Sequence, residues 1–587
     1  FELPRSSWQD YDKSLISAGG GVFSRSAKSI ELSPEIRQAL EIEDEVLDPA
    51  GLMKAILKAP AELLYFGGIG TYAKAAAETD LMVGDKANDP IRVDAGELRA
   101  KVVGEGANLG LTQAARIEFA RNGGRINTDA IDNSAGVDSS DHEVNIKILT
   151  GGAIASGALK SEDRNPLLAS MTEEVGHKVL AHNYDQTLAV SLVEAEGARG
   201  LEAQQRFMQA LGAAGKLDRK VEGLPNDLRI AEMLSHGSAL ARPELAVLLA
   251  YSKLELSDDI VASQAPEDPF FEETVVRYFP APLARFEAEM KGHRLRREII
   301  ATVMANEIVN MCGPTFPDRL RISAECDTTA LVVAFEAARR VFRLDEAWDA
   351  VSALDLKITA EAQTALYSEI AMVLRRQTLW LARRAKQGMS VGELIDIYRP
   401  AADALRQAGG DVLSQFEKGR LESRVKAFTD LGAPDALAAE VALLKPLVAT
   451  ADIGDLAREA EWQAPAMARL YHQVGAAFDF DRLRAAASTV PSADHYDRLA
   501  VRRLIGDLMA EQVMLTRAVA QAANESVGAT EQSAEAAVDA WIGERLAVVE
   551  GLRASVDQIE GSGSGWTFAK LTIANAAIRD VAAQAIR

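Results

Sequence analysis

Residues 100–137 read AKVVGEGANLGLTQAARIEFARNGGRINTDAIDNSAGV, and this stretch decides the fold that the sequence predicts. One apolar run, AKVVG, leads into the turn Glu105–Asn108, and a second, GRINTDAI, leads into the turn Asn133–Gly136. Between them, residues 112–122 carry a broad apolar face that predicts a helix. Short buried strands alternating with helices indicate a parallel α/β sheet. Ligands bind at the carboxyl edge of such sheets, so both turns are expected at a ligand site.

The same pattern extends over residues 1–150. SLIS (Ser14–Ser17) precedes three glycines, ELLYF (Glu62–Phe66) precedes Gly67-Gly68-Ile69-Gly70, and residues 49–58 have helical spacing. From about residue 151 the apolar residues follow a helical period instead. The run TALVVAF (Thr329–Phe335) fits either a strand or a buried helix. We therefore expect an α/β partial Rossmann-like lobe with a parallel sheet, followed by a long, mostly α-helical region.

The expected domains follow from this change of period. Residues 1–150 form the lobe, residues 151–190 are connecting helices that pack on it, and residues 191–587 form a helical C-terminal region. A break near 314–330, where prolines cluster, predicts two subdomains in that region.

Composition narrows the class of protein. The 587 residues are 48% hydrophobic and carry a net charge of −22, which opposes a role with nucleic acid or with anionic membranes. Only two cysteines are present, so no disulfide framework is implied. With no long apolar run, we predict a cytoplasmic protein. The chain begins at Phe1 without an initiator Met, which we interpret as a fragment or a processed product.

Gly68–Ala73 fits the pattern GxGxxA after a strand, which predicts a dinucleotide-binding turn that opens a helix. Gly68, Gly70 and Thr71 are therefore candidate cofactor-binding residues, because glycines let the backbone approach a pyrophosphate. The alternative is a tight turn that binds no ligand. An acidic residue at the end of a following strand is missing, since Asp85 and Asp89 lie in a loop-like stretch.

Asn108 and Asn133 are the stronger candidates, since each follows a predicted strand and an amide can match a carboxamide or a ribose. The alternative is that each simply forms a turn. An acidic cluster nearby suggests a metal, but its spacing does not fit a calcium loop, and we favour a solvated or structural role and predict no metal. Its members are Asp129, Asp132, Asp138, Asp141 and Glu143. Of the histidines, only His142 lies near the Asn133 turn.

Residues 102–143 resemble the glutamate dehydrogenase stretch that has an EGAN turn, a Thr and a helix, then an NAGGV turn and a Ser. LPRSSWQDYDKSLISAGGGVFSRSAKSI, LLYFGGIGTYAKA and VNIKIL resemble the large bacterial NAD-specific members of that family. The resemblance is high across residues 1–150 and weaker beyond. It implies the C-terminal part of such an enzyme, which uses NAD, converts L-glutamate to 2-oxoglutarate and ammonia, and forms homo-oligomers.

The resemblance also implies roles for residues. Asn108 and Asn133 would face the nicotinamide end of NAD, and Val137 and Ser140 would contact the distal carboxylate of glutamate. The pyrophosphate fingerprint of the family lies on an earlier strand, so Gly68–Ala73 would line the cofactor site near its ribose instead. The chain departs from the family pattern at Ala135 and at Asp141-His142, which leaves the details of the substrate pocket open.

The family's catalytic Lys and Asp precede these motifs, so we assign no catalytic residue here and expect the chain alone to be inactive. Two alternatives stay open. The helical region is a regulatory or assembly module of the enzyme, or the chain is another nucleotide-dependent α/β oxidoreductase in which Gly68–Ala73 holds the pyrophosphate.

Overall fold

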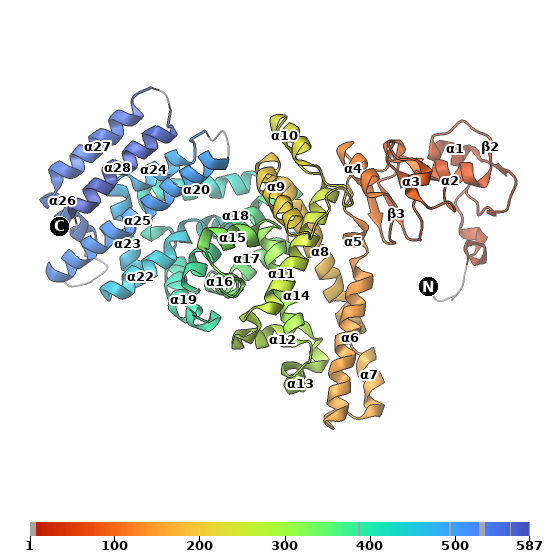
Figure 1. The fold of residues 1–587 in the computed structure, drawn as a ribbon, viewed down its shortest axis with the longest axis horizontal. Helices are drawn as coiled ribbons and strands as arrows, with labels where there is room; N and C mark the ends of the chain where they lie inside the picture. The colour runs from red at the N-terminus through yellow and green to blue at the C-terminus, as the bar shows by residue number, and fades with distance from the viewer. Residues whose placement is uncertain (1–6, 386–387, 492–494, 527–533, 564, 586–587) are drawn as a thin grey trace. The chain divides into compact units, whose positions relative to one another are not determined.

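The computed structural model describes residues 7–385, 388–491, 495–526, 534–563 and 565–585 (Figure 1). These residues belong to two compact units. The N-terminal unit comprises Phe1–Val261 and Phe271–Thr315, and the C-terminal unit comprises Ala262–Phe270 and Phe316–Arg587. In the described parts of the chain, every helix is too short or too polar to span a bilayer.

A small parallel sheet lies at the start of the N-terminal unit. Strand β3 (Leu63–Phe66) pairs in parallel with β6 (Val102–Glu105), and Phe66 lies opposite Glu105. Both strands were predicted from their apolar runs, and this part of the prediction is confirmed. On the other side of β6, the Val103 amide donates to the Arg125 carbonyl at 2.9 Å. The carboxyl ends of β3 and β6 therefore meet at one edge of the sheet.

Three further strand pairings are short. Strand β4 (Ala73–Lys74) pairs in parallel with β5 (Val93–Asp94), and β1 (Ile30–Glu31) pairs antiparallel with β2 (Val46–Leu47). A single bridge joins Ala73 to Leu111. The core under β3, β6 and β4 is apolar and includes helix α4 (Gln113–Arg121), which is why these elements hold together. Its buried members are Phe66, Ala73, Val93, Ala95, Leu98, Val103, Leu111, Ala115, Phe119 and Ile126.

Several helices of the N-terminal unit, among them α2 and α4, begin at side chains that cap their first turn. Asp48 accepts from the Gly51 amide at 2.7 Å before α2, and Thr112 accepts from the Ala115 amide at 3.1 Å before α4. The helices are α1 (Pro34–Leu40), α2 (Pro49–Leu57), α3 (Asp80–Val83), α4 (Gln113–Arg121), α5 (Asp129–Asp132), α6 (Ser134–Ala155), α7 (Arg164–Ala169), α8 (Thr172–Glu196), α9 (Ala198–Ala213), α10 (Asp227–Ser235), α11 (Arg242–Ala262), α12 (Glu272–Tyr278), α13 (Glu287–Lys291) and α14 (Arg296–Cys312).

The C-terminal unit is helical over its described residues. Its helices are α15 (Phe316–Ala324), α16 (Thr328–Val341), α17 (Leu344–Ser352), α18 (Ala360–Ala385), α19 (Val391–Ala408), α20 (Gln415–Asp430), α21 (Asp435–Leu444), α22 (Thr450–Ala460), α23 (Ala464–Ala477), α24 (Phe480–Ala487), α25 (His495–Ser526), α26 (Ala534–Glu544), α27 (Leu546–Glu560) and α28 (Phe568–Ala585). The run TALVVAF lies in α16, and every residue from Ala330 to Arg339 is buried. A segment that is buried on all sides is apolar on all sides over so short a run. TALVVAF therefore carries no periodic pattern that distinguishes a strand from a helix.

Three sequence expectations about the lobe are wrong. SLIS forms no sheet strand: Lys13–Leu15 is a 3-10 helix and Leu15 is 83% exposed. GRINTDAI is extended only near Arg125, and its end turns into α5. The residues after Gly70 do not open a helix but become β4. In each case the run is short, and its flanking residues do not favour strand, turn or helix. Tertiary contacts therefore determine which of these structures forms.

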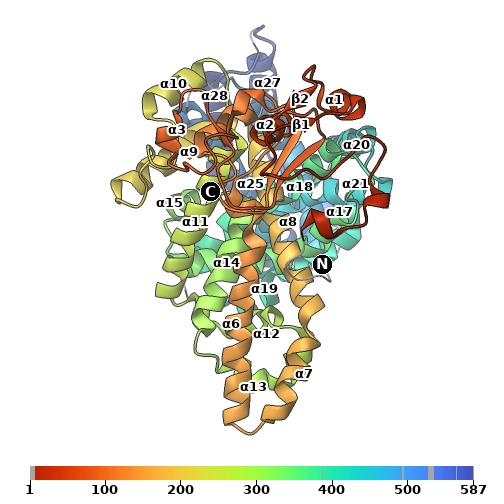
Figure 2. The ribbon, with the colours of Figure 1, turned by 90° about the vertical axis from the view of Figure 1, so that its right-hand side faces the viewer.

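The helical part of the chain also begins earlier than expected. Helix α6 starts at Ser134 rather than near residue 151, and it packs beside α8 (Figure 2). Its first two turns contain glycine, serines and aspartates, which hide a helical period. Asn183 of α8 donates to the Ile131 carbonyl at 2.7 Å and to Ser134 Oγ at 3.0 Å. Helix α8 therefore anchors the start of α6.

Lys253 of α11 gives this unit an expected pH dependence. Among the residues that the structure describes, its buried Nζ has no hydrogen-bond partner, and burial lowers the pKa of Lys253 to about 7, although Asp185 opposes the shift. Between about pH 7 and the ordinary lysine pKa near 10.4, the unfolded chain holds the extra proton, so stability should rise with pH in this window.

We expect Lys253→Met to remove this rise and to stabilise the N-terminal unit at pH 7 and below, by up to about 4 kcal/mol. Chemical unfolding at several pH values measures it, with exposed Lys160→Met as the matched control. Parallel stability curves for the wild-type and Lys253→Met chains would contradict the expectation.

Candidate functional site

The two asparagine turns meet at the carboxyl edge of the sheet. Asn108 follows β6, Asn133 directly precedes α6, and Asn133 Nδ2 donates to Asn108 Oδ1 at 2.7 Å. The structure therefore brings together two residues that lie 25 positions apart and that sequence alone had placed on the same edge. This bond uses one donor and one acceptor of the pair, and each amide has further capacity for a ligand.

The glycines after β3 leave the sheet at the same edge. The Ala107 amide donates to the Phe66 carbonyl at 3.0 Å, which joins the ends of β3 and β6. A Cβ at Gly106 would collide with the Tyr65 side chain, so a larger residue there would displace that ring. Gly68, by contrast, has open space around it. The edge thus presents accessible backbone beside the amide pair.

Gly70 and Thr71 are held by a separate set of charged residues. The Thr71 amide donates to Asp85 Oδ2 at 2.9 Å, and buried Arg92 donates to the Thr71 carbonyl at 3.0 Å. The hydrogen bond from the Thr71 amide is the largest of several effects that lower the pKa of Asp85. The chain after Gly70 is extended and leads into β4, so this turn does not open a helix. Gly68–Ala73 therefore lacks half of what a pyrophosphate fingerprint needs.

A buried ion pair between Glu105 and Arg116 holds the Asn108 turn in place. Glu105 ends β6, and its carboxylate accepts from Arg116 Nε at 2.7 Å and from Arg116 Nη2 at 2.9 Å. The Leu111 amide donates to Glu105 Oε1 at 3.0 Å. Both side chains are almost fully buried. Burial acts to lower the pKa of Arg116, but the hydrogen bonds and charges of Glu105 and Asp129 outweigh burial and raise that pKa.

Asp129 and Asp132 complete this network. Asp129 Oδ1 lies 3.2 Å from Arg116 Nη2, and Asp129 Oδ2 accepts from the Leu109 amide at 2.8 Å. Leu109 has a φ of 61°, a left-handed conformation that this bond helps to hold. Asp132 accepts from the Glu105 amide at 3.0 Å and from Asn127 Nδ2 at 3.0 Å. These two aspartates position the turns.

Sequence reasoning missed the Glu105–Arg116 pair, because its members lie on a strand and on a helix 11 residues apart. One signal was available: Arg116 stands inside the apolar run AARIEFA, where a charged side chain needs a buried partner.

The residues expected at the substrate lie on the first turns of α6. Val137 is 64% exposed, and Ser140 Oγ donates to the Gly136 carbonyl at 3.2 Å. Asn133, Val137 and Ser140 are spaced by four and then three residues, so they follow one face of the helix. This face begins at the amide pair and runs along an accessible surface.

Comparisons with known proteins match nearly the whole chain. A family profile described as "Bacterial NAD-glutamate dehydrogenase, catalytic domain" matches residues 1–193, and one described as "Glutamate dehydrogenase, C-terminal" matches residues 237–580. The chain is 40% identical over 583 residues to an NAD-specific glutamate dehydrogenase of Pseudomonas aeruginosa and 39% identical over 583 residues to one of Halomonas elongata. It is 37% identical over 586 residues to one of Mycobacterium tuberculosis. Each match covers 99% of this chain and 36% of the relative, so the chain spans about a third of their length.

Proposed function

Since this chain belongs to the bacterial NAD-specific glutamate dehydrogenase family, we propose that it forms the nicotinamide-facing edge of an NAD site used for oxidative deamination of L-glutamate. One observation carries the proposal: the Asn133–Asn108 hydrogen bond, which places two exposed amides side by side at the carboxyl edge of a parallel sheet. That edge is where α/β folds bind nucleotides. We further propose a cytoplasmic homo-oligomer, in keeping with the low cysteine content for the location.

The residues of this edge fit a nicotinamide nucleotide. NAD, when bound, accepts the hydride from glutamate. Asn108 can donate from its free N–H groups, Asn133 can accept at its carbonyl oxygen, and such groups match a carboxamide or a ribose hydroxyl. The buried Glu105–Arg116 pair keeps the Asn108 turn in place, so the amides are oriented before the cofactor arrives.

We place the distal carboxylate of glutamate beside Ser140, because a serine hydroxyl can donate to a carboxylate. Val137 would form the apolar wall next to it. Both lie on the helical face that starts at Asn133, which supports one continuous site for cofactor and substrate. We assign the water-activating Lys and the proton-transferring Asp of the reaction to no residue of this chain. Gly68, Gly70 and Thr71 are proposed to lie near the ribose.

The proposal is tested by Asn108→Ala and Asn133→Ala in the enzyme that contains this chain. Each should raise the Michaelis constant for NAD or lower turnover by about tenfold, the effect of losing one hydrogen bond of about 1.4 kcal/mol. Exposed Asn165→Ala, which makes the same chemical change on α7, should leave the kinetics unaltered. The 587-residue chain alone should form no NADH from glutamate. Unaltered kinetics in both asparagine variants would remove the assignment.

A further inference from the structure

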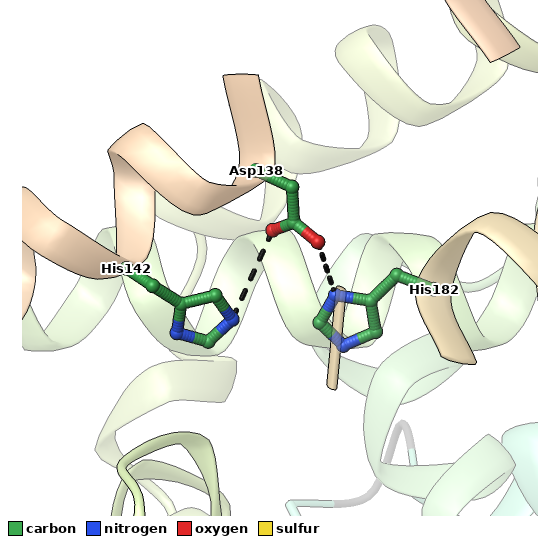
Figure 3. A group of neighbouring side chains, drawn as sticks. All are labelled: Asp138, His142 and His182. Carbon is green, nitrogen blue, oxygen red and sulfur yellow. Dashed lines mark hydrogen bonds and ion pairs between the residues drawn. The ribbon is translucent and has the colours of Figure 1, made fainter. Parts of the chain in front are cut away.

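Three side chains that can bind a metal converge between α6 and α8. Asp138 and His142 lie one turn apart on α6, and His182 comes from α8 (Figure 3). Asp138 Oδ2 lies 2.7 Å from His182 Nδ1, and Asp138 Oδ1 lies 3.8 Å from His142 Nε2. One ligand atom from each residue can be chosen so that all three lie within 4.8 Å of one another. Both rings point toward the carboxylate.

His142 is the unusual member of this group. It is only 1% exposed, yet neither ring nitrogen has a hydrogen-bond partner among the residues that the structure describes. Buried polar atoms in native proteins are nearly always paired, so two unpaired nitrogens on one buried ring need an explanation. The Tyr278 ring stacks on His142 at 4.6 Å, and Asn145 Nδ2 donates to the Tyr278 hydroxyl at 2.9 Å. The Tyr278 ring therefore fixes the plane of the imidazole.

We propose that Asp138, His142 and His182 form a binding site for one divalent transition-metal ion of the Zn²⁺ class. Two imidazole nitrogens and one carboxylate oxygen are a ligand set that such ions prefer, and three protein ligands leave a coordination position open. This inference goes beyond the proposed function and does not depend on it.

The local chemistry suits a cation. A metal binds an imidazole nitrogen that carries no proton, and a neutral His142 ring offers one such nitrogen. The charges that act on His142 are those of Asp138 on α6 and Lys178 on α8, while Asp138 and Asp141 both act on the stacked Tyr278 ring. The Lys178 ammonium donates to the Arg277 carbonyl at 2.9 Å. Two carboxylates against one ammonium leave a net negative charge, to which a cation is attracted.

A small movement closes the site. Metal–ligand distances of about 2.0–2.2 Å place tetrahedral ligand atoms roughly 3.3 Å apart, so the group must contract. The His182 side chain is 50% exposed, and its ring can turn and give the ion a path from solvent. The competing interpretation is an ordinary Asp138–His182 hydrogen bond. That bond accounts for His182 but leaves both nitrogens of His142 unpaired.

Zn²⁺ and Co²⁺ titrations of the untagged chain, without NAD or glutamate, test the proposal. We expect one ion per chain, and Co²⁺ should show the visible absorption of a site with nitrogen ligands. Asp138→Asn and His182→Gln, which change accessible side chains, should each weaken binding at least tenfold. His177→Gln removes an exposed imidazole from the same helix and should have no effect.

A chain that binds no ion, or one whose affinity falls equally in His177→Gln and His182→Gln, overturns the proposal. His142→Phe tests the buried ligand while its circular dichroism reports folding. If that variant fails to fold, the two accessible variants still decide. The experiment measures metal affinity, which does not depend on NAD binding. The NAD proposal can therefore fail while the metal proposal holds, and the metal proposal can fail while the NAD proposal holds.

Discussion

Replacing Arg116 by methionine is expected to destabilise the N-terminal unit by about 3–5 kcal/mol, the usual cost of leaving a buried charge without its partner. Glu105 is fully buried and depends on Arg116 for two of its hydrogen bonds. The Met side chain fills similar space but cannot donate. The carboxylate would then be stranded beneath the Asn108 turn, so the turn should loosen together with β6.

Hydrogen exchange of peptides that cover β6 and α4 measures this effect. A loss of 3 kcal/mol or more corresponds to opening about a hundredfold more frequent. Arg125→Met is the matched control, since its side chain is 62% exposed and its ion pair with Glu194 spans 3.8 Å, which is worth under about 1 kcal/mol.

The double variant Glu105→Leu with Arg116→Met should be less destabilised than Arg116→Met alone, because no buried charge is left. Exchange in Arg116→Met that matches Arg125→Met would show that the pair does not hold the turn.

Arg242→Met is expected to cost about 3 kcal/mol and to disturb the Asn133 turn. Arg242 begins α11, and its buried guanidinium donates to Asn127 Oδ1 at 2.9 Å, to Ser191 Oγ at 3.0 Å and to Glu194 Oε2 at 2.7 Å. Asn127 in turn donates to Asp132, the residue before Asn133. The effect therefore reaches the site through two side chains.

Faster exchange over residues 125–133 together with a higher Michaelis constant for NAD in the full enzyme is the expected result. Arg242→Lys keeps the charge but cannot reproduce the planar fork, so it should fall between the wild-type and Met variants. Arg229→Met removes an exposed pair with Glu232 and should change neither measurement. If Arg242→Met destabilises the chain but leaves exchange over residues 125–133 and the Michaelis constant for NAD unaltered, Arg242 supports only the helices.

The paired strands and their turns were predictable from sequence. Short apolar runs followed by glycine and asparagine are a local signal, and two such runs in a parallel sheet must end at the same edge. Leu63–Phe66 and Val102–Glu105 are those strands, and Asn108 follows the second of them. Asn133 was expected after a strand too, but it follows α5, and its contact with Asn108 comes from the tertiary fold. The helical character of the later chain was equally accessible, because amphipathic periods repeat over many residues.

What sequence could not decide depends on partners that are distant along the chain. Gly68–Ala73 looks like a strand–helix turn, but Asp85 and Arg92 hold it extended. Arg116 lies inside an apolar run, and only the tertiary structure shows that Glu105 is its buried partner.

Asp138 and His142 show the same limit, because Asp138 was assigned to a solvated or structural acidic cluster and His142 was noted only for lying near the Asn133 turn. His182 joins them from 44 residues away, on a different helix. Sequence by itself thus determined the family and the ends of β3 and β6, since these depend on local pattern. Only the tertiary structure decided which charges are buried and which histidines converge, since these depend on how separate elements pack.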